Sequence, residues 1–184
     1  MKRVGVLALQ GDFEAHGKAL ARAGALPVYV RHAAELKDLD GLIVPGGEST
    51  TMLKILREQK LFEPLREFGQ QKPMFGTCAG VILMATQVSN PVQDSLGLLD
   101  MTVTRNGYGR QIDSRIAEIA LDGENMEAVF IRAPVIERVG DQAKVLSEYQ
   151  GHPVLVDFGK HLAATFHPEL SQGTRVQELF LAKL

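Results

Sequence analysis

Residues 73–80, Pro-Met-Phe-Gly-Thr-Cys-Ala-Gly, form an apolar run that leads directly into a cysteine flanked by small residues. This run predicts a short buried strand at 73–76 that turns sharply into a helix at 81–86. Glycines two positions before and after a nucleophile, here Gly76 and Gly80, let the backbone bend and the following helix pack closely. The stretch therefore predicts a strand–turn–helix elbow within an α/β fold.

The sequence on either side of the elbow predicts the rest of the fold. Before it, short β-branched runs alternate with helical patterns, which is typical of βαβ units and a largely parallel sheet. After it, strand-like runs are separated by Gly, Asp and Pro turns. The fold predicted for residues 1–184 is α/β, a single-domain three-layer doubly wound sheet, mostly parallel in its first half with antiparallel additions in its second. The expected strands are 4–9, 26–30, 41–44, 101–104, 116–121, 129–131, 144–149, 154–158 and 162–166; the other expected helices are 13–23, one capped by Ser49 or Thr50 and ending at 56, 62–68 and 175–184.

Composition excludes several classes of function. The chain has 184 residues, with 20 basic and 22 acidic side chains and a formal net charge of −2, so no polyanionic partner such as nucleic acid is indicated. No apolar run approaches the roughly 20 residues that cross a bilayer, and no signal peptide opens the sequence. A single cysteine cannot form an internal disulfide. We therefore expect a cytoplasmic protein without a membrane partner, in which Cys78 is free for chemistry.

Cys78 is a candidate nucleophile because the amide groups at a helix N-terminus favour a thiolate. A lone cysteine among apolar residues is more often an inert core residue, so the hypothesis needs a base. His167 meets that need, because it follows an apolar strand and Glu169 projects to the same side of an extended backbone. A carboxylate on one ring nitrogen leaves the other to take the thiol proton. The remaining histidines, His16 among them, are expected to be structural or solvated.

A second glycine-rich strand end, Pro45 to Thr50, completes the predicted site. In open α/β sheets ligands bind at the carboxyl ends of the strands, where the cysteine, the histidine and this segment all lie. Adjacent glycines permit a main-chain orientation that side chains hinder, so the amide of Gly47 is expected to form an oxyanion hole together with that of Ala79. Alone, the Gly-Gly pair would indicate only a turn.

The combination PGGEST, GTCAG and FHPE resembles class I glutamine amidotransferases. The stretches VLALQGDFEAH, LIVPGGESTT, FGTCAG, RNGYGRQIDS, FIRAP and FHPEL are similar, in order and spacing, to the glutaminase subunits of pyridoxal 5′-phosphate synthases over nearly the whole chain. The resemblance implies a Cys-His-Glu triad of Cys78, His167 and Glu169. It also implies glutamine binding by Gly46, Gly47, Glu48, Arg105, Ile131 and Arg132.

The resemblance further implies the reaction and its partner. L-glutamine is hydrolysed to L-glutamate and ammonia through a glutamyl-thioester, and the ammonia is channelled to a synthase (lyase) subunit in a hetero-oligomeric complex that makes pyridoxal 5′-phosphate, vitamin B6. No cofactor and no metal are expected in this subunit. The turn at Gln10 and Gly11, after the first strand, is a candidate for sensing that the partner has docked.

Other readings remain open at this point. One is a cysteine hydrolase or stress protein on the same elbow architecture, which would act on peptides or aldehydes. Another is a silent doubly wound module that only binds a partner. A third is the glutaminase of another biosynthetic amidotransferase, such as those of histidine, anthranilate or purine synthesis.

Overall fold

A computed structural model describes residues 1–105 and 114–184 of the chain. Its main sheet has seven strands in the order β10-β11-β12-β4-β3-β1-β2. Strands β2, β1, β3, β4 and β12 run parallel, and β11 and β10 continue the sheet as an antiparallel extension of β12. The predicted α/β fold, with a mostly parallel first half and antiparallel additions, is therefore confirmed.

The elements follow one another along the chain as β1 (Arg3–Leu7), α1 (Phe13–Arg22), β2 (Leu26–Val30), η1 (Ala33–Leu36), β3 (Gly41–Val44), α2 (Ser49–Glu58), α3 (Phe62–Gln71), β4 (Met74–Thr77), α4 (Ala79–Met84), β5 (Ala85–Ser89), β6 (Leu99–Thr104), β7 (Ser114–Leu121), β8 (Glu124–Ile131), β9 (Val135–Val139), β10 (Lys144–Tyr149), β11 (His152–Phe158), β12 (His161–Ala164), η2 (Pro168–Leu170) and α5 (Arg175–Leu181). Two small sheets, β5-β6-β9 and β7-β8, accompany the main one.

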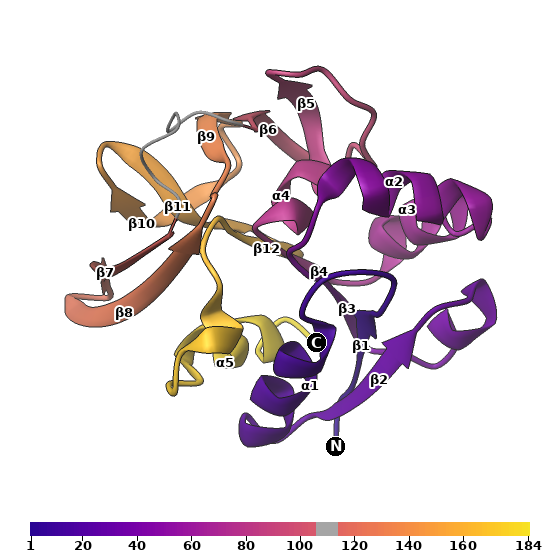
Figure 1. The fold of residues 1–184 in the computed structure, drawn as a ribbon. Coiled ribbons are helices and arrows are strands. Elements are labelled where there is room, and N and C mark those ends of the chain that lie inside the picture. The colour runs from indigo at the N-terminus through magenta and orange to yellow at the C-terminus, as the bar shows by residue number, and fades with distance from the viewer. Residues whose placement is uncertain (106–113) are drawn as a thin grey trace.

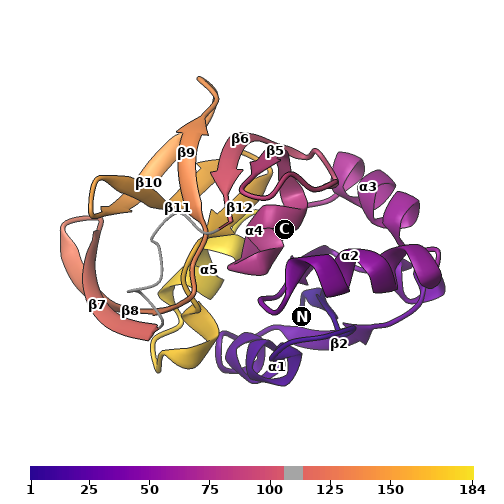
Figure 2. The same ribbon diagram turned by 45° about the horizontal axis from the view of Figure 1, so that its top comes forward.

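Helices cover both faces of the main sheet (Figure 1). Both faces need cover, because the strands contribute apolar side chains to a core cluster on each side. Successive side chains of a strand point to opposite faces, so Val6 packs with α1 and α5 while its neighbour Leu7 packs with α2, α3 and α4. The β7–β8 hairpin contributes Ile119 and Phe130 to the α1 and α5 side of the core, and Figure 2 shows it curving outward from the sheet.

The sequence predicted several boundaries differently. The helix expected at 81–86 is α4, which begins at Ala79 and ends at Met84, because Ala85 already pairs with Leu99 of β6. Strands β5 and β9 were not predicted. The N-cap of α2 is Glu48, whose carboxylate accepts hydrogen bonds from the amides of Thr50 and Thr51, so the expectation of a Ser49 or Thr50 cap was wrong.

The parallel register places the segments of interest at one edge of the sheet. Strands β1, β3, β4 and β12 all point the same way. The turn at Gln10 follows β1, the Gly46–Gly47 segment follows β3, Cys78 follows β4 and His167 follows β12. None of the helices in the described ranges 1–105 and 114–184 is long and apolar enough to cross a membrane.

Candidate active site

Cys78 occupies a tight turn between β4 and α4. Its backbone lies in an unusual conformation, with φ 49° and ψ −109°, which a non-glycine residue adopts only when its surroundings hold it there. The main chain of Gly80 passes so close to β3 that a Cβ there would lie 2.0 Å from the Val44 carbonyl oxygen. Only glycine fits at that position, which explains the second glycine of the elbow.

His167 and Glu169 form a buried hydrogen-bonded pair directly after β12. The distance from His167 Nδ1 to Glu169 Oε1 is 2.7 Å, and the Glu169 side chain is 1% exposed. Pro168 begins the 3₁₀ turn η2 that holds the two residues together. The geometry fits the predicted pairing, in which the carboxylate orients the ring.

Cys78 and His167 border the same small space beside Gly46. A Cβ on Gly46 would lie 2.7 Å from His167 Cε1 and 3.3 Å from Cys78 Cβ. The thiol of Cys78 donates a long hydrogen bond to the Ile131 carbonyl oxygen, at 3.7 Å. Buried Nε2 of His167 has no hydrogen-bond partner in the part of the chain that the structure describes. The fold thus brings the predicted nucleophile and base together and leaves the second ring nitrogen free to exchange a proton.

The surroundings of His167 favour its protonated form. Burial of the ring lowers its pKa, but the neighbouring Cys78 sulfur and the hydrogen-bonded Glu169 carboxylate outweigh burial and raise the pKa to about 10. Burial of the Glu169 carboxyl acts to raise its pKa, but the hydrogen bond from His167 and the neighbouring imidazoles hold that pKa below its usual value. A neutral Cys78 thiol donates a hydrogen bond to the Ile131 carbonyl. An ionised sulfur can only accept a hydrogen bond, and protonated Nε2 of His167 can donate one to it. The site is therefore suited to a thiolate–imidazolium pair.

A further histidine, His16 of α1, lies behind this pair and was not among the predicted site residues. It is 1% exposed, with Nε2 3.1 Å from Thr77 Oγ1 and 3.4 Å from Glu169 Oε2. A sequence signal for it exists, because His16 lies three residues after Phe13 and four before Leu20, on the inward stripe of the helix. That spacing predicts a buried His16 side chain, which fits the structural role and not the solvated role among the two expected for it.

Glu48 organises the loop after β3. Its carboxylate caps α2 through Thr50 and Thr51 and lies 3.2 Å from the guanidinium of Arg105. Burial raises the pKa of this carboxyl, but the hydrogen bonds from Thr51 and Thr50 prevail and lower it to about 2. The amide of Glu48 donates to Oε1 of Gln10 at 2.8 Å. Contacts with the start of α2, with Arg105 and with Gln10 therefore fix the position of Glu48 in the loop after β3.

The structure places the other predicted residues as follows. The carbonyl of Ile131 reaches the thiol, whereas Arg132 is exposed, with a positive φ of 45°. Residues 106–113, part of the RNGYGRQIDS stretch, lie outside the described residues. Within residues 1–105 and 114–184, no group of three or more His, Cys, Asp or Glu side chains is arranged to hold a metal ion.

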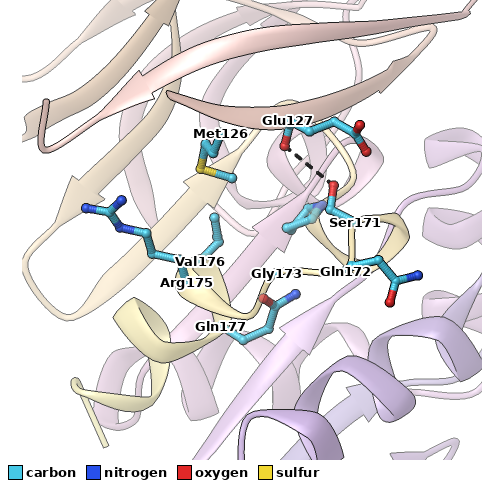
Figure 3. A pocket seen from close by; sticks show the side chains of 9 residues that line it. Met126, Glu127, Ser171, Gln172, Gly173, Arg175, Val176 and Gln177 are labelled. Atoms are coloured by element: carbon cyan, nitrogen blue, oxygen red, sulfur yellow. Dashed lines mark hydrogen bonds between the residues drawn. The ribbon is translucent and has the colours of Figure 1, made fainter. Parts of the chain in front are cut away.

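A cavity of about 270 Å³ lies between β8, η2 and the start of α5 (Figure 3). It shares Pro168 with the His167–Glu169 segment, but none of Cys78, His167 and Glu169 lines it. Its walls include Met126, Val176 and Gln177, and the hydroxyl of Ser171 donates to the Glu127 carbonyl at its rim. Because it does not open onto the thiol, this cavity is not where a substrate of Cys78 binds.

Comparison with known proteins gives consistent matches over the whole length. The model of the SNO glutamine amidotransferase family matches residues 6–184. The chain is 59% identical to the pyridoxal 5′-phosphate synthase subunit PdxT of Solibacter usitatus, with 100% of both chains covered. It is 57% identical to the subunit of the same name from Koribacter versatilis, covering 97% of this chain and 94% of that one.

Solved structures agree with these matches. A crystal structure described as a glutamine amidotransferase is 44% identical, with a TM-score of 0.92 and coverage of 98% of this chain and 97% of that one. The structure of PurLQS from Thermotoga maritima, at 17% identity, a TM-score of 0.75 and coverage of 98% of both chains, shares the fold.

Proposed function

Because the chain belongs to the SNO glutamine amidotransferase family, we propose that it is the glutaminase subunit of a pyridoxal 5′-phosphate synthase, with Cys78, His167 and Glu169 as its catalytic triad. The observation that carries the triad is the convergence of three strand ends: Gly46 lies against both Cys78 Cβ and His167 Cε1, and Glu169 holds the far side of the imidazole. The reaction consumes L-glutamine and water and yields L-glutamate and ammonia.

In the first half of the reaction the Cys78 thiolate attacks the side-chain amide carbon of glutamine. The carbonyl π-electrons move to oxygen and give a tetrahedral oxyanion. Imidazolium Nε2 of His167 then donates its proton to the amide nitrogen, the C–N bond breaks, and ammonia leaves a glutamyl-thioester. The high pKa of His167, about 10, keeps this proton available near neutral pH.

The oxyanion needs hydrogen-bond donors, which we assign to the amides of Ala79 and Gly47. Ala79 is the first residue of α4, so its amide has no carbonyl partner inside the helix. The Gly46 carbonyl is directed at Gly11, and in a trans peptide the following N–H points the opposite way. Strand β3 lies between β1, which leads to Gly11, and β4, which leads to Cys78. A Gly46 carbonyl that points toward Gly11 therefore favours a Gly47 N–H that points toward Cys78. Each such donor is worth about 3–4 kcal/mol in the transition state.

In the second half, neutral His167 takes a proton from water, and the resulting hydroxide attacks the thioester. The second oxyanion collapses, the C–S bond breaks, and glutamate leaves with the thiolate restored. Glu169 stabilises the imidazolium in both halves without itself gaining the proton.

Glutamine is held, in this proposal, by Gly46, Gly47, Glu48, Arg105, Ile131 and Arg132. The Glu48 carboxylate and the Arg105 guanidinium, 3.2 Å apart, offer opposite charges to the α-ammonium and α-carboxylate of the substrate. The Ile131 carbonyl, already beside the thiol, borders the amide end. Arg132 follows it and is exposed, which supports a role in binding the carboxylate.

The partner in this proposal is the synthase (lyase) subunit, which receives the ammonia in a cytoplasmic hetero-oligomeric complex, with residues 1–184 acting as one amidotransferase domain. Gln10 is the proposed sensor of docking, because its side chain accepts from the Glu48 amide and lies close to Gly47. Movement of the turn after β1 would therefore shift Gly47 and the Glu48 amide directly.

The test is glutamate release from glutamine, with and without the synthase subunit, by the native chain and by Cys78→Ala. We expect strong stimulation by the partner and loss of activity to the background level in the variant. Activity on peptides or aldehydes without glutamate release would favour the cysteine hydrolase reading instead. Stimulation by a synthase of histidine, anthranilate or purine formation, and not by this one, would reassign the pathway.

A further inference from the structure

His16 is a buried imidazole that the reaction described above does not use. It lies on α1, and the side chains of His16 and Glu169 are each 1% exposed where Nε2 approaches Oε2 to 3.4 Å. Glu169 thus meets two imidazoles, His167 at Oε1 and His16 at Oε2. Oε1 accepts the hydrogen bond from His167, whereas Oε2 has no hydrogen-bond donor within residues 1–105 and 114–184, so the 3.4 Å approach of His16 is an electrostatic contact and not a hydrogen bond. A buried carboxylate oxygen without a donor is costly, and His16 Nε2 is the nitrogen beside it that can lower this cost.

The protonation state of His16 follows from its surroundings. Burial lowers its pKa; Glu169 and Asp12 act to raise the pKa, and His167 acts to lower it further. The ring is therefore neutral near pH 7 and carries one N–H. Because the Glu169 carboxylate can only accept, we place the proton on Nε2, which then donates to Thr77 Oγ1 at 3.1 Å and lies 3.4 Å from Oε2 of Glu169. Nδ1 is then unprotonated, and it has no partner within residues 1–105 and 114–184.

These contacts link the two strand ends of the site through one continuous series of side chains. Thr77 precedes Cys78 at the end of β4, and its hydroxyl contacts His16. His16 contacts Glu169, which bonds His167 after β12. Helix α1 therefore links the segment that carries the nucleophile to the segment that carries the base, through one imidazole ring.

We propose that His16 is a positioning residue of the glutaminase reaction: its Nε2–H, anchored on Thr77, stabilises Oε2 of Glu169 electrostatically across 3.4 Å, so that Oε1 stays on Nδ1 of His167 and Nε2 of that ring faces the thiol. The inference rests on the proposed function and adds a residue to it. Without His16 the carboxylate can rotate away from His167, and displacements on the order of 1 Å at a reacting group cost up to about a hundredfold in rate.

The test compares variants of His16 in the complex with the synthase subunit. In His16→Gln the amide nitrogen can reach the position of Nε2, whereas in His16→Asn the side chain is too short to reach Glu169. In His16→Phe the shape is kept without any donor. His161→Phe is the matched control, because His161 is the other deeply buried imidazole that lies away from Cys78, and it bonds the Met74 amide instead.

Two measurements separate positioning from packing. The first is kcat and KM for glutamine: we expect kcat to fall about 10- to 50-fold in His16→Phe and His16→Asn, with KM within about twofold, and His16→Gln to stay within about threefold of the native chain. The second is the downfield proton resonance of His167 Nδ1–H, bonded to Glu169, which we expect to weaken or vanish in Phe and Asn and to persist in Gln and in His161→Phe.

The outcomes decide the proposal in either direction. If His16→Phe does not fold, the matched Gln and Asn pair still makes the comparison. Folded Phe or Asn variants that keep the resonance and a native kcat would overturn the proposal, and so would equal losses in His16→Gln and His16→Asn. If the native chain releases no glutamate, the proposed function fails, while the resonance still reports whether His16 orients the Glu169–His167 pair.

Discussion

The two ends of strand β12 carry histidines with opposite acid–base behaviour. His161 is the first residue of the strand, and burial together with the charge of Lys160 lowers its pKa to about 4. His167 lies just beyond the other end, where burial acts in the same direction but Cys78 and Glu169 raise its pKa to about 10. His161 is 7% exposed and His167 is 9% exposed, so burial alone does not distinguish them.

The difference comes from what each strand end faces. Nδ1 of His161 accepts a hydrogen bond from the Met74 amide at 3.0 Å. An unprotonated ring nitrogen thus satisfies the amide of the first residue of β4. His167 faces a carboxylate and a thiol at the carboxyl ends of the parallel strands, the edge where α/β folds place their sites. His161 therefore serves as a structural acceptor, whereas His167 is the imidazole that we propose as the proton carrier.

The largest expected effect comes from making the same substitution at both ends. His167→Asn removes the group that we propose protonates the leaving ammonia and activates water, so we expect kcat for partner-stimulated glutamate release to fall about 10³- to 10⁴-fold. His161→Asn keeps an acceptor near the Met74 amide, and we expect kcat within about twofold of native. Comparable losses at the two positions would remove the distinction between the two histidines.

A smaller loss is expected when the base keeps its ring but loses its carboxylate. In Glu169→Gln the neutral amide orients His167 less well and stabilises imidazolium less, so we expect a lower pKa of His167 and a fall in kcat of about 10²-fold. The loss should be smaller than in Cys78→Ala, because the carboxylate does not attack the substrate. Steady-state glutamate release and NMR titration of the ring measure the two effects; a loss equal to that of Cys78→Ala would give Glu169 another role.

The sequence predicted these strand ends better than it predicted what packs behind them. The strands at 26–30, 41–44 and 144–149 were predicted with their observed bounds, because β-branched runs between clear turn signals leave little choice. Strand β9 was missed, since its Val-Ile-Glu-Arg-Val pattern is stabilised as a strand by pairing with distant β6. Tertiary pairing of this kind cannot be predicted from the local pattern.

The same limit applies to the site. Gly-rich turns, Cys78 and the His-Pro-Glu segment have local signatures that indicated chemistry, and the fold brings all three together. His16 has no such signature: its contact with Glu169 depends on how α1 lies against the sheet and η2. Arg105 and Glu48 were inferred only from the family resemblance, and their ion pair joins residues 57 positions apart in sequence.

The smallest expected effect is on stability in acid, and it isolates His161. Its pKa is lower in the folded chain, about 4, than the value of about 6.5 of an unfolded histidine, so protons bind the unfolded state more tightly between these values. The contribution of neutral His161 is therefore fully present above pH 6.5 and is lost as the pH falls toward 4. His167, with its raised pKa, contributes fully throughout this window and loses its contribution only as the pH rises toward 10.

We expect the free energy of unfolding of the native chain to fall by about 1–3 kcal/mol more than that of His161→Asn between pH 6.5 and 4.5, because solvent screening reduces the free energy that corresponds to the full pKa shift. Urea unfolding at the two pH values measures the difference; parallel losses in both proteins would show that His161 titrates as an ordinary exposed histidine and that the two ends of β12 do not differ in this respect.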